Sequence, residues 1–225
     1  MRPRAGLWWA LPLGLALLFG GCEWATGDAF QVSKALQTLS AAPYQSDGGQ
    51  TELRLKFLSD TVEPLGAGRA RAFSRVDVSG RYLGVETRCI CVERVALVRI
   101  DGAWAFEGFP LPRLAAVGAA LDARVAAYNA ADAIAYRGLI DPDYRDEGQD
   151  AEALAARLSA LFEGGNPLRQ EITERVLRVE GQEAIVTESY RIKGVLGGRE
   201  IDERGRARFT LAPGPAGWRF TSGLL

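Results

Sequence analysis

The stretch REIDERGRARFTL, residues 199–211, carries the clearest structural pattern in this chain. Charged residues alternate along it with Ile201, Ala207, Phe209 and Leu211. A period of two is typical of a strand that has one solvated face and one buried face. The stretch therefore predicts an antiparallel sheet that covers a core on one side only.

Two sets of strands are expected on either side of a helical region. Around the opening stretch, alternation and β-branched residues predict three more strands, over residues 172–179, 184–195 and 218–224. A separate set is expected over residues 51–109, where Leu53, Leu55 and Phe57 alternate with charged residues. Its predicted turns are Gly66, Gly80, Gly84 and Asp101-Gly102, and Pro110 and Pro112 mark a linker after it.

Between the two sets, residues 114–163 have helical spacing. Apolar residues recur every three to four positions in two stripes, which are Leu121, Val125, Tyr128 and Leu154, Leu158, Leu161. Asp132 and Asp150 precede helical segments and are interpreted as N-caps. An earlier helix is expected from Asp28, because Val32, Leu36 and Leu39 fall on one face.

Helices followed by long antiparallel strands favour an α+β domain, with helices packed on a curved sheet. Four stretches carry a resemblance to a known superfamily: YNAAD at 128–132, DPDYRD at 141–146, the strand at 183–192, and GWRF at 217–220. On these, residues 113–225 resemble the nuclear transport factor 2-like superfamily, also called ketosteroid isomerase-like or SnoaL-like. The resemblance implies a cone-shaped sheet that encloses a pocket.

The first set of strands echoes the second. Gly80, Leu83-Gly84 and Trp104-Ala105-Phe106 align with Gly194, Leu196-Gly197 and Trp218-Arg219-Phe220 at separations of 113 to 114 positions. Two interpretations stay open. Residues 51–112 are either a shortened first copy of a duplicated domain or a set of generic hairpins, since glycine turns and aromatic strands recur in any antiparallel sheet.

The N-terminus resembles a bacterial lipoprotein signal peptide. Arg2 and Arg4 precede an apolar run over residues 7–19, and small residues follow up to Cys22. The run LLFGGC at 17–22 is similar to a lipobox, which implies cleavage after residue 21 and acylation of the Cys22 thiol. Residues 22–50 are then a lead and a short helix. The alternative is an uncleaved anchor, although the run is short for a membrane span.

That resemblance implies an address in the cell envelope. The chain is expected to be lipid-anchored, with the membrane as its first partner, and in a Gram-negative host it faces the periplasm from the outer membrane. The predicted signal segment holds two of the 27 basic residues and none of the 28 acidic ones. No clustered basic excess is present, so we expect no nucleic-acid partner.

Histidine is absent from the sequence. This excludes serine–histidine triads, cysteine–histidine dyads and histidine-ligated zinc. Glycine-rich phosphate loops are also missing, so we expect no nucleotide and no other cofactor. The acidic segment over residues 141–152 resembles a calcium loop only in part, because Asp146 stands where such a loop needs glycine. We therefore expect no metal and interpret the segment as a solvated turn.

Cys89 and Cys91 lie two apart on an expected strand, so their side chains share one face. The preferred interpretation is two small buried thiols. A disulfide is the alternative outside the cytoplasm, although their Cα atoms would lie about 6.5–7 Å apart in a regular strand, which requires a local kink. A soft-metal site lacks further ligands.

Four residues are candidates for a pocket if the superfamily resemblance holds: Glu188, Tyr128, Tyr136 and Tyr190. Enzymes of this superfamily place a carboxylate there as general base and a tyrosine that stabilises an oxyanion. The bland alternative is a strand-edge charge and aromatic core. The sequence favours a non-catalytic module that binds a small apolar ligand or an envelope protein. The alternative is a lyase or isomerase that uses a pocket carboxylate.

Overall fold

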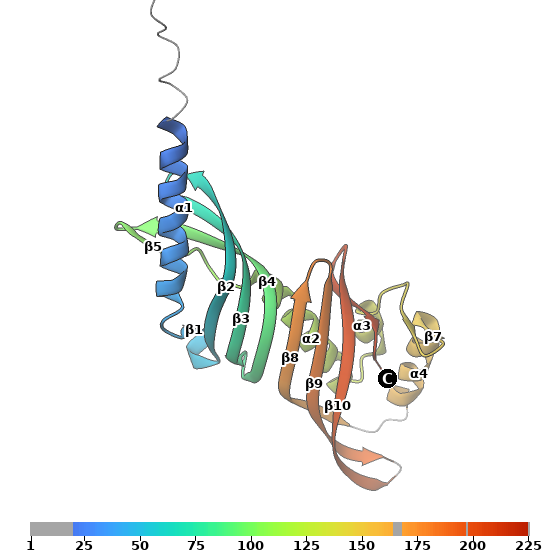
Figure 1. Cartoon of the computed structure of the whole chain (residues 1–225). Helices are drawn as coiled ribbons and strands as arrows, with labels where there is room; N and C mark the ends of the chain where they lie inside the picture. The colour runs from blue at the N-terminus through green and yellow to red at the C-terminus, as the bar shows by residue number, and fades with distance from the viewer. Residues whose placement is uncertain (1–19, 164–167, 197, 225) are drawn as a thin grey trace, which may run out of the picture.

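The structure is a computed structural model that describes residues 20–163, 168–196 and 198–224 (Figure 1). Its helices are α1 (Gly20–Leu39), the short 3-10 helix η1 (Asp47–Gly49), α2 (Pro112–Asn129), α3 (Ala133–Gly138) and α4 (Ala151–Glu163). The strands of the first half are β1 (Tyr44–Ser46), β2 (Thr51–Gly66), β3 (Arg69–Tyr82), β4 (Val85–Ile100) and β5 (Ala103–Phe106). Those of the second half are β6 (Arg145–Asp146), β7 (Gln149–Asp150), β8 (Arg169–Glu180), β9 (Glu183–Leu196), β10 (Arg199–Gly214) and β11 (Gly217–Ser222).

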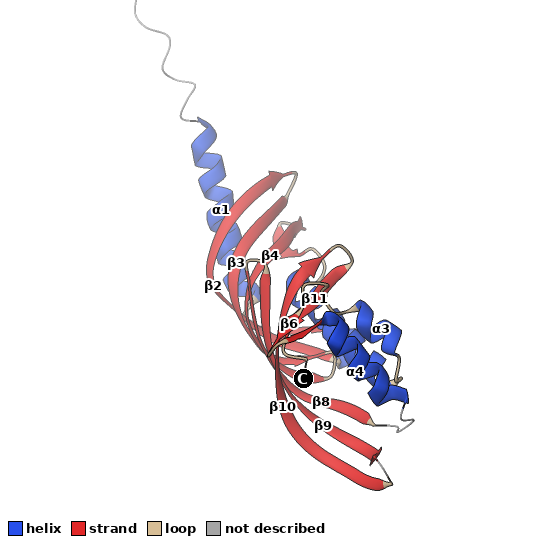
Figure 2. Ribbon diagram, turned by 90° about the vertical axis from the view of Figure 1, so that its right-hand side faces the viewer, coloured by secondary structure: helices blue, strands red, loops and turns tan. Residues whose placement is uncertain are grey.

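Nine of these strands form one curved sheet in the order β1-β2-β3-β4-β8-β9-β10-β11, with β5 paired to β4. The predicted α+β class with a curved, largely antiparallel sheet is confirmed (Figure 2). Helices α3 and α4 lie against the second half of the sheet, whereas α1 runs beside the first half (Figure 1). The described helices include none that is long and apolar enough to cross a membrane.

The two halves meet along a parallel pair of strands. Residues 86–91 of β4 pair with residues 174–179 of β8 in parallel register. Sequence patterning predicted antiparallel strands and did not anticipate this pair. Parallel neighbours need a long crossover, and α2, α3 and α4 supply it between β5 and β8. The expected modules 51–112 and 113–225 therefore contribute to one continuous sheet.

Each half contains the same three-stranded unit. Strand β3 pairs with β4 from Tyr82↔Val85 onward, and β9 pairs with β10 from Leu196↔Arg199 onward, exactly 114 positions later. The ladder of β2 shifts register between Phe57 and Ser59, and the ladder of β8 shifts between Ile172 and Glu174. A β-bulge thus falls at the matching place in both units. A shortened first copy remains our interpretation of this repeat.

The buried face of the first half holds two hydrophobic clusters. One cluster joins α1 to the far ends of β3 and β4 through Val32, Leu36, Ala72, Val95 and Leu97. The larger one lies under α2 and continues into the second half. Between the two clusters on the same sheet face lies the cross-strand pair Ser74↔Glu93. The apolar face is therefore divided by one buried polar pair.

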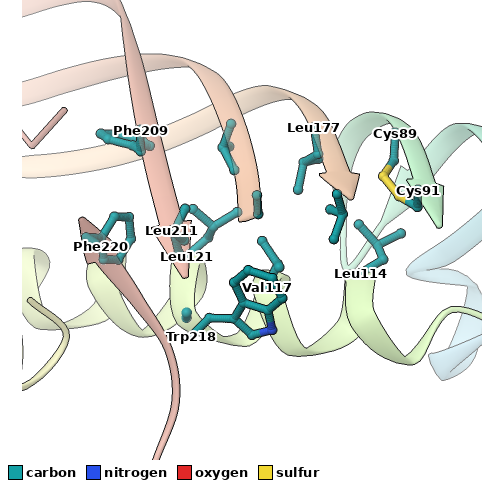
Figure 3. Packing of buried hydrophobic residues seen from close by; sticks show 14 of the residues in the cluster. Cys89, Cys91, Leu114, Val117, Leu121, Leu177, Phe209, Leu211, Trp218 and Phe220 are labelled. Atoms are coloured by element: carbon teal, nitrogen blue, oxygen red, sulfur yellow. A yellow bond between two sulfur atoms is a disulfide. The ribbon is translucent and has the colours of Figure 1, made fainter. Parts of the chain in front are cut away.

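Helix α2 lies across the junction of the two halves. Its Leu114, Val117 and Leu121 pack over buried residues of β4, β8 and β11, with Leu177 and Trp218 on the facing strands (Figure 3). Gly118 of this helix lies against the Tyr82 ring, where an added Cβ would come within 2.9 Å of a ring carbon. Glycine therefore permits the close approach of helix and sheet.

Three local predictions are wrong. Helix α1 already includes Gly20, so it does not begin at Asp28, and the expected polar lead from residue 22 is helical. Gly80 lies inside β3, because the hairpin turns three residues later at Leu83-Gly84. Pro112 is the first residue of α2, where its missing N–H costs no helical hydrogen bond. Most of the predicted signal peptide, 1–21, lies outside the described residues.

Candidate functional site

A pocket of about 660 Å³ opens in the second half between helices α3 and α4 and strands β9 and β10. Its walls are mostly apolar or phenolic, and arginines provide the charges. The lining residues are Arg124, Tyr128, Tyr136, Leu154, Arg157, Leu158, Ala160, Leu161, Gln170, Tyr190, Ile192, Arg206, Ala207, Phe209, Gly223 and Leu224. None of these is acidic. Pockets of this size and composition hold small organic molecules in other proteins.

Glu188 lies on β9 behind this pocket and is fully buried. Its Oε2 accepts a hydrogen bond from Nη2 of Arg124, and its Oε1 accepts one from Nε of Arg175 at 2.9 Å. Arg175 also contacts Asp122 at 2.7 Å. Both arginines are themselves buried, at 3% and 2% exposed. Both oxygens of this carboxylate are thus engaged by guanidinium groups, and Glu188 is not among the residues that line the pocket.

Arg124 connects this ion cluster to the pocket. Besides Glu188, it donates through Nη1 to Oε1 of Gln170 at 3.1 Å, and its guanidinium lies 4.7 Å from the centre of the Phe209 ring. Its buried Nε has no hydrogen-bond partner among the described residues. Arg124 therefore brings positive charge to the pocket, and its Nε is a buried donor without a partner among the described residues.

The three candidate tyrosines all line the pocket. Tyr136, on α3, is buried, and burial raises the pKa of its hydroxyl, whereas the positive charge and N–H groups of Arg124 beside it act in the opposite direction. Burial likewise raises the pKa of Tyr128 on α2. These phenols stay protonated near neutral pH and serve as hydrogen-bond donors. The structure thus brings Tyr128, Tyr136 and Tyr190 together and places Glu188 behind them.

Three aspartates around α3 and α4 accept backbone hydrogen bonds. The Asp132 carboxylate accepts from the Ala135 amide and Asp150 from the Ala153 amide, both at 2.9 Å, which confirms the two predicted N-caps. Asp146 accepts from the Gly223 amide at 3.1 Å and thereby holds the C-terminal segment. Beside it, burial raises the pKa of Tyr144 to about 12.

The two cysteines of β4 are joined by a disulfide (Figure 3). Their Cα atoms are 5.7 Å apart, closer than the distance expected for a regular strand, yet both residues keep their pairing to β3. The preferred interpretation from the sequence was two free thiols. Cys22 lies near the start of α1 within the described residues, where acylation remains a prediction.

A second buried carboxylate, Glu93 on β4, escaped the sequence analysis. It is 1% exposed and accepts hydrogen bonds from the Arg113 and Leu114 amides at 2.9 and 2.8 Å, at the start of α2. Burial raises its pKa to about 7, although both amides and the Arg113 charge lower it. Glu93 follows Cys89 and Cys91 at inward-facing positions of the strand, a signal that the alternation contained.

The sequence analysis also missed Arg124 and Arg175, although the pattern of apolar positions contained a signal for both. Arg124 interrupts the apolar stripe between Leu121 and Tyr128, and Arg175 occupies an inward position two residues before Leu177. A charged residue on an otherwise apolar face indicates a buried ion pair. The pattern therefore marks Arg124 on α2, Arg175 on β8 and Glu188 on β9 as buried charges. It does not show that the three contact one another.

Several solved structures are similar to about half of this chain, and their similarity concerns the fold alone. A provisionally named dehydratase of the NTF2-like family from Streptomyces avermitilis is 15% identical, with a TM-score of 0.45, over 50% of this chain and 94% of its own. An NTF2-like protein with a cystatin-like fold from Novosphingobium aromaticivorans is 20% identical, with a TM-score of 0.41, over 50% and 79%.

A third structure is a provisionally named ketosteroid isomerase from Shewanella frigidimarina, 20% identical with a TM-score of 0.40, over 48% of this chain and 92% of its own. No protein-family model matches the sequence. No curated protein matches it either. The chemistry of the site therefore rests on its own residues.

Proposed function

We propose that this chain is a membrane-anchored binding module that holds a small, largely apolar molecule in the pocket of its second half. The observation that carries the proposal is the state of Glu188. This carboxylate is fully buried and its two oxygens are held by Arg124 and Arg175, while the 660 Å³ pocket in front of it has no acidic lining residue. The lining residues can contact a ligand, and Glu188 holds one of them, Arg124, in place.

A lyase or isomerase would need a carboxylate free to take a proton from the ligand. Releasing Glu188 for that step would leave two buried guanidinium groups without their shared partner, at a cost of several kcal/mol. The pocket's phenols are donors near neutral pH and do not replace the missing base. Binding without turnover is the function that these contacts favour.

Native mass spectrometry of the chain, gently extracted from its own envelope, tests for the ligand. Wild-type protein is expected to carry a small-molecule adduct. Ala160→Trp, on an exposed position of α4 that lines the pocket, should remove the adduct. Ala156→Trp is the matched control, because Ala156 is equally exposed on α4 and does not line the pocket. Wild-type protein without an adduct, or a co-extracted protein with the pocket empty, contradicts the proposal.

The envelope address is a separate part of the proposal. It is supported by the order of basic, apolar and small residues before Cys22. Cys22→Ser should release the chain from the membrane fraction and abolish the mass of the attached acyl chains. A Cys22→Ser variant that is still processed and still sediments with membranes contradicts acylation at this residue.

A further inference from the structure

We infer that the molecule bound in this pocket is an organic anion, with its carboxylate or sulfonate at Arg124 and an apolar body against α4. The inference rests on the proposed function and adds the chemical class of the ligand. It starts from the charges of the pocket. Its lining includes Arg124, Arg157 and Arg206 and no acidic residue. An apolar cavity whose described lining residues carry only positive charges favours a ligand that is both apolar and negatively charged.

The fully buried charges behind the pocket are two cations and one anion. Two buried guanidinium groups, of Arg124 and Arg175, share one buried carboxylate, that of Glu188. The next negative charge is Asp122, which contacts Nη2 of Arg175, and its side chain is 43% exposed. Solvent weakens the field of Asp122 more than that of the buried groups. The pocket floor therefore keeps a positive potential.

Arg124 also has an unused donor at the floor. Its Nη1 and Nη2 are bonded to Gln170 and Glu188, whereas its buried Nε has no partner among the described residues. A buried N–H without an acceptor costs free energy. A small shift of the Arg124 side chain toward the pocket would let a ligand oxygen accept from it. The Tyr136 hydroxyl lies beside the same guanidinium. Both side chains line the pocket and carry donors for an anionic oxygen.

The remaining walls suit an apolar body and steer the anion inward. Leu154, Leu158 and Leu161 of α4 face the pocket opposite Phe209. Arg157 is exposed on the same helix and makes no ion pair with any residue that the structure describes. Arg206 contacts Glu174 at 3.8 Å, so its charge is partly compensated. Arg157 is thus the rim residue expected to attract an anion.

Calorimetry with a matched pair of small molecules tests the inference. The probes are 4-phenylbutyrate and 4-phenyl-1-butanol, which share one body and differ in the carboxylate. They are titrated into the full chain held in lipid nanodiscs, and the heat of empty nanodiscs is subtracted. The carboxylate is expected to bind at least about tenfold more tightly, which corresponds to one charge-assisted hydrogen bond.

Equal affinity for the two probes overturns the inference while the proposed function stands, and no binding of either probe overturns the inference as well. The proposed function is tested independently by native mass spectrometry, through the presence of a small-molecule adduct. Arg157→Gln should lower affinity for 4-phenylbutyrate about two- to fivefold and leave the alcohol unchanged. Arg208→Gln, an exposed arginine of β10 that does not line the pocket, is the control.

Arg124→Lys tests the floor itself. It keeps the positive charge but loses the planar guanidinium that reaches Glu188, Gln170 and the ligand together. We expect this variant to lose most of the preference for the carboxylate probe. Circular dichroism checks that it folds, and the Arg157 variant decides the question if it does not. A folded Arg124→Lys variant with the wild-type preference contradicts the assignment of Arg124 as the anion-binding residue.

Discussion

The two halves of this molecule bury a glutamate at the same place and neutralise it in different ways. The pair Ser74↔Glu93 of the first half corresponds to Glu188↔Ala207 of the second, each residue shifted by 114 positions. In the first half the carboxylate sits on β4 and takes two amide hydrogens from the start of α2. In the second half it sits on β9 and takes two guanidinium groups.

The difference follows from which helices cover each unit. The first half has α1 and the start of α2 over its concave face, and its apolar clusters close around the polar pair. The second half adds α3 and α4 before its strands, and their side chains form the outer wall of the pocket. A helix N-terminus neutralises charge without side chains, whereas a pair of arginines leaves donors for a ligand. The same cross-strand position therefore lies among apolar clusters in one half and behind a pocket in the other.

The largest expected effect comes from the second-half glutamate. Glu188→Gln removes the charge that Arg124 and Arg175 share and should lower the free energy of unfolding by about 3–5 kcal/mol. Urea denaturation followed by circular dichroism measures it. Glu183→Gln, an exposed change on the same strand, should stay within about 0.5 kcal/mol. Glu188→Gln matching that control would show that the cluster does not stabilise the fold.

The first-half glutamate should act through pH. Its folded pKa of about 7 lies above the ordinary 4.5, so the folded chain binds the proton more tightly than the unfolded chain. Its contribution to stability is fully present below pH 4.5 and is lost as pH rises through 7. The loss in the free energy of unfolding is about 3 kcal/mol. Unfolding of wild type and Glu93→Gln across this pH range should show the difference between them change steadily. A difference independent of pH contradicts the raised pKa.

The smallest effect should come from the disulfide, which has no counterpart in the second half. Cys89 and Cys91 enclose a loop of very few residues, so the bond restricts the unfolded chain only slightly. Its reduction should lower the free energy of unfolding by about 1–2 kcal/mol. Thermal melts with and without a phosphine reductant measure this. Alkylation of the non-reduced, unfolded protein followed by mass spectrometry must leave both residues unmodified, and two labelled thiols would refute the bond.

Local patterns in the sequence predicted the elements better than the contacts between them. Alternation along 199–211 and its neighbours predicted strands β8 to β11, because a half-buried strand imposes a period of two on its residues. The aspartates before α3 and α4 predicted the caps, since capping is a local hydrogen bond. The start of α1 was wrong because the apolar and small residues before Asp28 were assigned to a signal segment and a polar lead.

Long-range contacts were beyond the pattern. Pairing between β4 and β8 joins residues more than 80 positions apart, and nothing in either strand specifies its partner. Glu188 was a pocket candidate with a strand-edge position as the alternative, and the structure buries it. Its role depends on Arg124 and Arg175, which come from two other elements. Their positions in apolar stripes marked them as buried. Only the tertiary fold assigned them to one carboxylate.

The parallel junction of β4 and β8 also determines how the chain tolerates truncation. A fragment cut near residue 112 would expose the backbone N–H and C=O groups of residues 86–91 on one piece and of 174–179 on the other. Unpaired strand edges recruit further strands, so each fragment would tend to self-associate. One of the two fragments would also lack helix α2, which packs against both halves. Expression of either half alone should therefore give inclusion bodies, whereas the uncut chain has no such edge at this seam.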